Sequence, residues 1–386
     1  FLASEAMHHL GVDTTRALSL VVSEREKVMR PWYSGGRSQD PDTMISEQCA
    51  ITTRVAPSFL RVGHLDLFAR RARRQATPAH LEEHRQILEH ALFREYPEVA
   101  AGSLRDRTIA MLESAAVRMG RLVSGWLRVG FCQGNFNADN CLISGRTMDY
   151  GPFGWIEQYD PLFAKWTGSG DHFAFMNQPD AAVANYFTLV SAAVPVLGEG
   201  DIKIRELVQL GDKSIREAVQ DMFRAKLGFP EGSKNAAACW TQLEPLMKRS
   251  SVDYTIFWRQ LAAIAEQCWE SEPSLALLDR AFYEKPSKNL VTDWTTWLRK
   301  WLTDVSSEST VDQVSARLRA TNPKYVPREW MLVQAYTAAD QGNYDLVHEL
   351  YKLFQNPYDE QPEFEDKYFR GASREMLTKA GCAHMS

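Results

Sequence analysis

The sequence predicts an α+β protein in which a short mixed segment precedes a large, predominantly helical body. Two observations carry this prediction. Short runs that are apolar and rich in β-branched residues fall near the start, at residues 16–23 and 49–56, as is typical of strands. From residue 185 onward, apolar residues recur at spacings of three and four, as in amphipathic helices. A chain of 386 residues is long enough to bury a core.

The elements follow in chain order. A short helix over residues 1–10 is followed by the two strands, with a loop of Gly, Ser and Asp over 34–47 between them. Helices are expected at 78–93 and at 103–130, and the second has apolar residues at helical spacing: Ile109, Leu112, Ala116, Met119 and Leu122. Turn residues and short apolar pieces predict a hairpin-like loop over 137–154. Breaks in the helical remainder are expected at 228–235, 271–273, 306–310 and 356–362.

Composition argues against several classes of protein. The net charge of −5 is unlike that of a general nucleic-acid-binding protein, which usually has a strong basic excess. We expect no membrane span, because the most apolar stretch, 188–197, is short and contains Pro195. The six cysteines form no C-x-x-C pair, which is typical of a reducing compartment.

Residues 131–154 hold the most informative polar side chains. Asp139 and Asn140 are followed, nine residues after the Asn, by Asp149 in a D-Y-G tripeptide. An Asn carbonyl and an Asp carboxylate on two antiparallel arms can supply oxygen ligands for Mg²⁺. In protein kinases these ligands are the Asn that ends H-R-D-x-x-x-x-N and the Asp of D-F-G. On spacing alone, ordinary turn residues explain the same pattern.

The kinase comparison is incomplete at the residue that activates the substrate hydroxyl. The kinase catalytic Asp lies five residues before its Asn, where this chain has Asn135, and the motif's His corresponds to Gln133. Gln133 can hold backbone geometry by hydrogen bonds but cannot carry charge. Asp139 is the nearest replacement carboxylate, so a conventional protein kinase is disfavoured.

Several blocks of sequence resemble the selenoprotein O family. The D-Y-G-P-F-G run at 149–154, with N-x-D-N at 137–140 before it, is similar to the family's catalytic segment. Further similar blocks recur in family order along the chain, at residues 4–18, 54–64, 173–179, 322–326 and 356–363.

The resemblance implies a protein-kinase-like fold with adenylyltransferase activity. Family members are described as pseudokinases that bind ATP in a flipped orientation and transfer AMP to Ser, Thr or Tyr hydroxyls of other proteins. Carried over by position, Asp139 is the proton acceptor, and Asn140 and Asp149 hold Mg²⁺, or Mn²⁺ in its place. Arg54 and Arg61 bind the nucleotide, as does Asp149. From the residues alone, an ion pair on a strand and a turn is the favoured explanation for the two arginines.

The resemblance also divides the chain. Residues 1–75 correspond to the remainder of an N-lobe, and 76–386 to a helical C-lobe with the catalytic loop 131–154 and a C-terminal helical extension. The family's glycine-rich segment and ATP-contacting Lys would lie upstream of Phe1, so we expect a fragment that is inactive alone. The alternative is a non-catalytic pseudokinase module that binds nucleotide or protein. The compartment is open: mitochondrial for a eukaryotic protein, cytoplasmic for a bacterial one.

The remaining patterns have plainer explanations. Lys165 stands where some relatives have a disulfide-forming Cys, so that disulfide is expected to be absent, and Cys382 is either a free redox thiol or inert. The basic cluster at 70–74 is more typical of a solvated face than of a substrate-docking or phosphate-binding patch. A tryptophan series at helical spacing, Trp294, Trp297 and Trp301, predicts a helix packed into the core.

Overall fold

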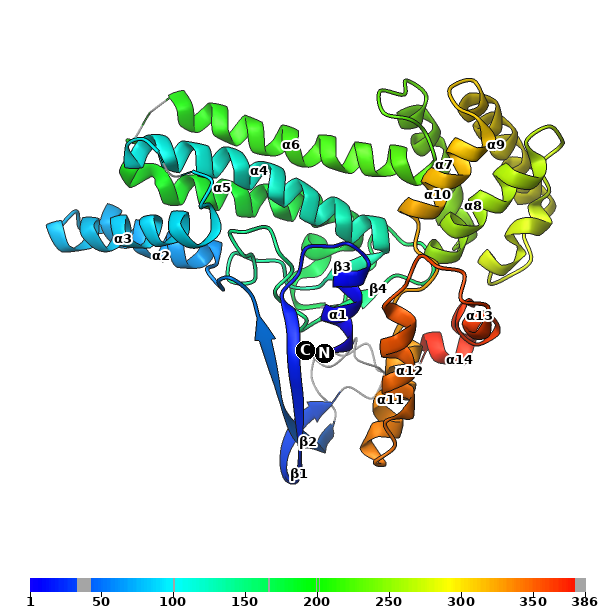
Figure 1. Cartoon of the computed structure of the whole chain (residues 1–386), viewed down its shortest axis with the longest axis horizontal. Coiled ribbons are helices and arrows are strands. Elements are labelled where there is room, and N and C mark those ends of the chain that lie inside the picture. Colours follow the sequence, from blue (N-terminus) through cyan, green and yellow to red (C-terminus); the bar gives the residue numbers. More distant parts are fainter. Residues whose placement is uncertain (33–42, 100, 166, 199, 201, 379–386) are drawn as a thin grey trace.

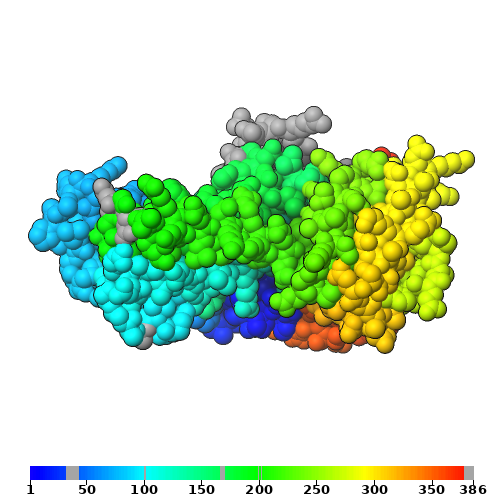
Figure 2. All heavy atoms as spheres, turned by 90° about the horizontal axis from the view of Figure 1, so that it is seen from above, coloured from blue at the N-terminus to red at the C-terminus, as the bar shows by residue number. Residues whose placement is uncertain are grey.

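The computed structural model describes residues 1–32, 43–99, 101–165, 167–198, 200 and 202–378. Over these residues the protein is α+β and mostly helical, with two small two-stranded sheets. Three long helices, α4 (Leu104–Val129), α5 (Gln178–Leu197) and α6 (Ile202–Lys226), lie side by side along the upper part of Figure 1. Seen from above, the body is elongated, with blue and yellow helices at opposite ends (Figure 2).

The N-terminal segment consists of α1 (Leu2–His9) and a long antiparallel ribbon, β1 (Arg16–Trp32) and β2 (Thr43–Val55). The ribbon projects from the body (Figure 1). Both predicted strands are confirmed, but each extends beyond its predicted range. The extra residues form the projecting half of the ribbon, which is solvated and therefore has no apolar pattern that would predict a strand. The predicted loop over 34–47 is therefore wrong for residues 43–47, which are strand, and its other residues lie outside the described ranges.

Two helices follow the ribbon and form one end of the molecule (Figure 1). The helix α3 (Pro78–Glu95) confirms the prediction over 78–93, and the Thr77 side chain caps its start. The preceding helix α2 (Val62–Arg74) was not predicted from the sequence. Its buried residues include the small Ala69 and Ala72, which pack against α5 and give only a weak apolar signal.

The central helix α4 confirms the predicted helix over 103–130. The Ser103 hydroxyl accepts a hydrogen bond from the backbone of Asp106, and Gly130 ends the helix with a φ of 78°. A close approach of α6 requires Gly120, because a Cβ there would lie 2.9 Å from the Ser214 carbonyl oxygen. Two short strands follow, β3 (Phe131–Gln133) and β4 (Phe153–Trp155), then the 3₁₀ helices η1 (Thr167–Phe173) and η2 (Phe175–Asn177).

The C-terminal half is helical, as predicted, and each predicted break falls at a junction between helices. The tryptophan series on the helix α9 (Lys288–Ser306) is buried, with Trp294 and Trp301 fully enclosed, which confirms the predicted core helix. The elements after α6 are α7 (Ala236–Ser250), α8 (Tyr254–Cys268), η3 (Leu275–Ala281), α9 (Lys288–Ser306), α10 (Val311–Thr321), α11 (Glu329–Asp340), α12 (Asp345–Phe354), α13 (Pro362–Tyr368) and α14 (Arg374–Thr378).

One apolar segment is longer than the sequence analysis allowed. The helical run Phe175–Leu197 has a mean hydropathy of 1.4 and is, by length and composition, sufficient to cross a membrane. It contains α5, which packs against α2, α4 and α6 and buries polar Gln178 and Asn185. These contacts are those of a core helix.

The C-terminal segment 356–363 joins the last helices to α1. The Pro357 carbonyl accepts hydrogen bonds from the backbones of Lys324 and Tyr325, at 2.8 and 3.1 Å. The Tyr358 hydroxyl donates to the Leu10 carbonyl at the end of α1, at 2.9 Å. This arrangement gives a structural role to a block that the sequence analysis could only match to a family.

Candidate active site

The strands β3 and β4 close the base of the candidate catalytic loop. They pair antiparallel, with Gln133 opposite Phe153, and the backbone N–H of Gly134 donates to the Pro152 carbonyl at 2.6 Å. A Cβ at Gly134 would lie equally close to that oxygen, so the tight closure requires glycine. Residues 135–151 therefore form a loop whose two ends are held together by this pairing.

Two buried side-chain amides on α5 form hydrogen bonds to the backbone of this loop and of β3. The Gln178 side chain accepts from the Gln133 backbone N–H at 2.9 Å and donates to the Phe131 carbonyl at 3.0 Å. The Asn185 side chain donates to the Phe136 carbonyl at 2.8 Å. In the sequence, Gln178 stands out only as part of a block similar to the family, and neither role is predicted from it.

Asp139 sits in a turn that faces the start of α2. The Asn137 side chain accepts from the Asp139 backbone N–H at 2.9 Å, which fixes the turn. The Gly63 backbone N–H donates to the Ala138 carbonyl at 2.9 Å, and a Cβ at Gly63 would lie only 2.1 Å from Asp139 Oδ1. The exposed Asp139 carboxylate therefore rests against the positive end of the α2 dipole.

Asn140 and Asp149 each have one polar side-chain atom in a hydrogen bond and one side-chain oxygen available. The Asn140 side-chain N–H donates to the Asn135 carbonyl at 2.9 Å, so the amide oxygen Oδ1 points the other way. Asp149 Oδ1 accepts from the Gly151 backbone at 2.9 Å. Within the described residues, neither Asn140 Oδ1 nor Asp149 Oδ2 has a hydrogen-bond partner.

A hairpin contact brings these two arms together. Cys141 and Thr147 form an isolated antiparallel bridge, which confirms the predicted hairpin. Antiparallel pairing directs the residue before Cys141 and the residues after Thr147 toward the same end of the hairpin. Asn140 and Asp149 therefore lie at the same end of the hairpin.

The two predicted nucleotide-binding arginines contact different arms of this hairpin. Arg54, near the end of β2, donates to the carbonyl of Met148, the residue before Asp149. Arg61 immediately precedes α2 and forms a bridge with Leu142. Arg61 Nε is buried and has no hydrogen-bond partner among the described residues. Neither arginine makes an ion pair there, so the ion-pair explanation is not supported.

The segment between α1 and β1 fixes the other side of the D-Y-G tripeptide. The Asp13 carbonyl accepts from the Thr147 backbone at 2.8 Å, and Trp126 Nε1 donates to the Thr147 hydroxyl at 2.8 Å. The Tyr150 and Thr14 hydroxyls share a hydrogen bond of 2.5 Å. Burial raises the pKa of Tyr150, so its hydroxyl stays protonated and acts as a structural group.

Gln133 and Asn135 stand at the positions of the kinase His and catalytic Asp. The expectation that the Gln133 side chain holds the loop is wrong: both of its polar atoms are buried without a partner among the described residues. Gln178 performs that function through the backbone instead. The Asn135 side-chain oxygen accepts from Asn137 at 2.9 Å. Neither side chain is a carboxylate, so Asp139 remains the candidate proton acceptor.

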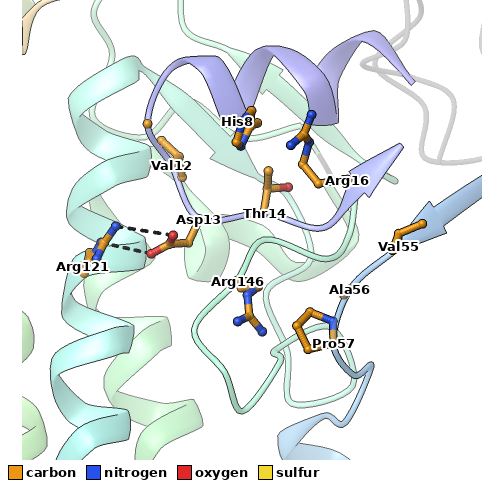
Figure 3. A pocket seen from close by; sticks show the side chains of 11 residues that line it. His8, Val12, Asp13, Thr14, Arg16, Val55, Ala56, Pro57, Arg121 and Arg146 are labelled. Carbon is orange, nitrogen blue, oxygen red and sulfur yellow. Dashed lines mark hydrogen bonds and ion pairs between the residues drawn. The ribbon is translucent and has the colours of Figure 1, made fainter. Parts of the chain in front are cut away.

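A separate hollow of about 380 Å³ lies beside the segment that follows α1 (Figure 3). The three arginines that line it, Arg16, Arg121 and Arg146, all pair with carboxylates, at 2.7, 3.0 and 2.8 Å respectively. None of the predicted site residues lines it. The hollow is therefore distinct from the candidate active site.

The available donors fit a magnesium–nucleotide complex. Mg²⁺ usually takes one or two protein oxygens and completes its shell with phosphate oxygens and water. Asn140 Oδ1 and Asp149 Oδ2 are of this kind, and the described residues hold no group of three His, Cys, Asp or Glu that could bind a metal. The buried, unpartnered Arg61 Nε is a donor that a phosphate oxygen would satisfy.

The fold and this site define an α+β protein with a polar loop suited to a metal-bound nucleotide. The chain matches the family described as protein adenylyltransferase SelO over residues 1–355, and it belongs to that family. The family and its named relatives are nucleotidyltransferases, which places this protein in that class of enzyme.

Three relatives illustrate the similarity, and each is named protein nucleotidyltransferase YdiU. The protein from Azoarcus sp. is 37% identical over 391 residues, and that from Aromatoleum aromaticum is 36% identical over 393 residues. The protein from Flavobacterium johnsoniae is 33% identical over 391 residues. Each match covers 100% of this chain and 71 or 72% of the relative.

Proposed function

We propose that this protein, on a protein-kinase-like fold, transfers AMP from ATP to a Ser, Thr or Tyr hydroxyl of a protein substrate. The supporting observation is the meeting of three features at one hairpin. These are the exposed Asp139 carboxylate against α2, the available oxygens of Asn140 and Asp149, and the unpartnered Arg61 Nε. Together they offer a proton acceptor, metal ligands and a phosphate-binding cation.

Each residue has a role in the proposed step. The substrate oxygen attacks the α-phosphorus of ATP, the bond to the pyrophosphate oxygen breaks, and Asp139 accepts the hydroxyl proton. Asn140 and Asp149 hold Mg²⁺, which supplies positive charge beside the phosphates when it is bound. Arg54 and Arg61 donate to phosphate oxygens, for which the planar guanidinium is well suited.

The second candidate function is a non-catalytic pseudokinase module. It is favoured by Gln133 and Asn135, because uncharged amides stand where kinases have a His and the catalytic Asp. A module of this kind would bind Mg–ATP through the same ligands without transferring any part of it.

The test compares the fate of the two ends of ATP. The full-length protein is incubated with Mg²⁺, a protein acceptor and ATP labelled on either the α- or the γ-phosphate, beside Asp149→Ala. We expect α-label on protein, lost in Asp149→Ala. Protein labelled only from γ-labelled ATP would indicate a kinase and contradict the proposal. Nucleotide binding without either label would indicate the non-catalytic module.

A further inference from the structure

The helix α2 has two different sides. Its buried residues face α5 and the core: Val62, Leu65, Ala69 and Ala72. Gly63, Leu67, Arg71 and Arg74 are spaced by three and four residues and so share the opposite side. Leu67 is 41% exposed, and Arg71 and Arg74 are exposed as well.

This exposed side begins at the candidate proton acceptor. The position where a side chain at Gly63 would project is occupied by the Asp139 carboxylate, 2.1 Å from an ideal Cβ. Asp139 therefore lies on the same side of α2 as Leu67, Arg71 and Arg74. From its N-terminal end, α2 leads away from the centre of the molecule toward its end (Figure 1).

The far end of this side carries uncompensated positive charge. Arg70 and Arg73 share the carboxylate of Asp66, at 3.0 and 3.7 Å. Arg71 and Arg74 have no ion-pair partner within the described ranges, and the Arg71 guanidinium lies 5.3 Å from the centre of the Phe68 ring. A partner with negative charge would complement both arginines.

We propose that this side of α2 is a docking surface for an acidic segment of the protein substrate, which guides the adjacent hydroxyl to Asp139. The proposal rests on the proposed function and assigns it a substrate class. At a rise of about 1.5 Å per residue, Arg71 and Arg74 lie roughly 12 and 17 Å along the helix from Gly63. An extended peptide covers about 3.3 Å per residue. The acidic residues should therefore lie about three to five positions from the modified hydroxyl.

The plainer explanation is that these arginines are solvated and stabilise the C-terminal end of the helix. That explanation predicts no preference for acidic substrates. It does predict loss of stability when the charges are reversed, so thermal unfolding of each variant is measured alongside binding.

The experiment uses fluorescent peptides with one Ser and three Asp residues placed three to five positions from it. Matched peptides carry Asn or Lys in place of Asp. Binding is measured by anisotropy, independently of AMP transfer, for the wild type and Arg71→Glu/Arg74→Glu. The control Lys234→Glu/Lys248→Glu changes the net charge equally at exposed sites outside α2.

We expect the double α2 variant to bind the Asp peptide roughly tenfold more weakly and the Lys peptide more tightly, and the control variant to behave as wild type. In transfer reactions, KM for the Asp peptide should rise while kcat is retained, since these arginines are remote from the reacting atoms. Transfer to the Asn peptide reports the proposed function separately and should be unchanged.

Equal binding of the Asp and Asn peptides to the wild type would overturn the proposal, as would an equal loss in both double variants. Tighter binding of duplex DNA through the same arginines would also overturn it, because the surface would then recognise a different polyanion.

Discussion

Asp139, Asn140 and Asp149 differ in what their side chains already contact. The Asn140 amide N–H and one Asp149 oxygen are used by neighbouring backbone groups, which leaves one oxygen of each directed elsewhere. The position of the Asp139 side chain depends on packing, because it occupies the space that a Cβ at Gly63 would fill. The assignment of roles therefore rests on the particular atoms that are left over, and not on residue type alone.

Gly63→Ala should lower the rate of AMP transfer without lowering the stability of the fold. The new methyl would displace the Asp139 carboxylate, so we expect kcat for AMP transfer to fall at least about tenfold. Because Ala favours a helix over Gly by roughly 0.5–1 kcal/mol, the melting temperature should be unchanged or slightly higher. Both quantities are measured on the same preparation.

The matched control is Gly125→Ala, where the added Cβ would make only ordinary 3.5 Å contacts with Val12. It should retain full transfer. Normal activity in Gly63→Ala would mean that the position of Asp139 is not critical.

At the scale of elements, α5 supports the loop through hydrogen bonds that no local pattern could reveal. Gln178→Ala should destabilise the protein by about 2–5 kcal/mol, because it leaves a buried backbone N–H and two carbonyls without their partner. Urea unfolding measures the change. The neighbouring Asn177→Ala removes an exposed hydrogen bond and should cost less than about 1 kcal/mol. Equal losses in both variants would show that Gln178 has no special role.

Sequence predicted the elements whose signals are local. The helix α4 has a strong apolar periodicity, a Ser cap and a terminal glycine, so its bounds were predicted to within a residue or two. The helix α2 was missed because its buried side includes two alanines and its last turn is basic. The projecting half of the ribbon was missed because its side chains are solvated, so pairing alone defines it.

The candidate site likewise has residues that the sequence predicts and residues that it does not. Asp139, Asn140 and Asp149 lie close together in sequence and could be selected by their spacing and resemblance. Gly63 and Gln178 act on them from distant segments, and neither contact leaves a pattern along the chain. The division into an N-lobe at 1–75 and a C-lobe at 76–386 stays a prediction, and Cys382 lies outside the described residues.

At the scale of the whole molecule, a buried charge network connects the segment after β4 to the C-terminal helices. Arg328 pairs with Asp253 at 2.7 and 2.8 Å and also contacts Glu157, which follows β4. The Tyr283 hydroxyl donates to Glu157 at 2.9 Å. One cation thus faces two carboxylates, and burial, aided by the charge of Asp253, raises the pKa of Glu157.

This network makes stability depend on pH. Because the pKa of Glu157 is higher in the folded than in the unfolded state, its contribution is present below about pH 4.5 and is lost as the pH rises through the folded value. Glu157→Gln removes the titrating group. Relative to wild type, this variant should be more stable at pH 8 than at pH 5, as measured by urea unfolding. The exposed control Glu363→Gln should show no such difference, and identical pH slopes for Glu157→Gln and wild type would contradict the expectation.

In the proposed reaction, Asp149 binds the metal–nucleotide complex while Asp139 serves the transfer step. The most direct measurement is the calorimetric Kd for ATP, with Mg²⁺ or with a chelator, for wild type, Asp149→Asn and Asp139→Asn. We predict that Mg²⁺ strengthens binding to the wild type and to Asp139→Asn, and that Asp149→Asn loses this gain, by about tenfold or more. Asp139→Asn should bind Mg–ATP normally yet transfer no AMP. Mg²⁺-dependent binding that survives in Asp149→Asn would contradict the account.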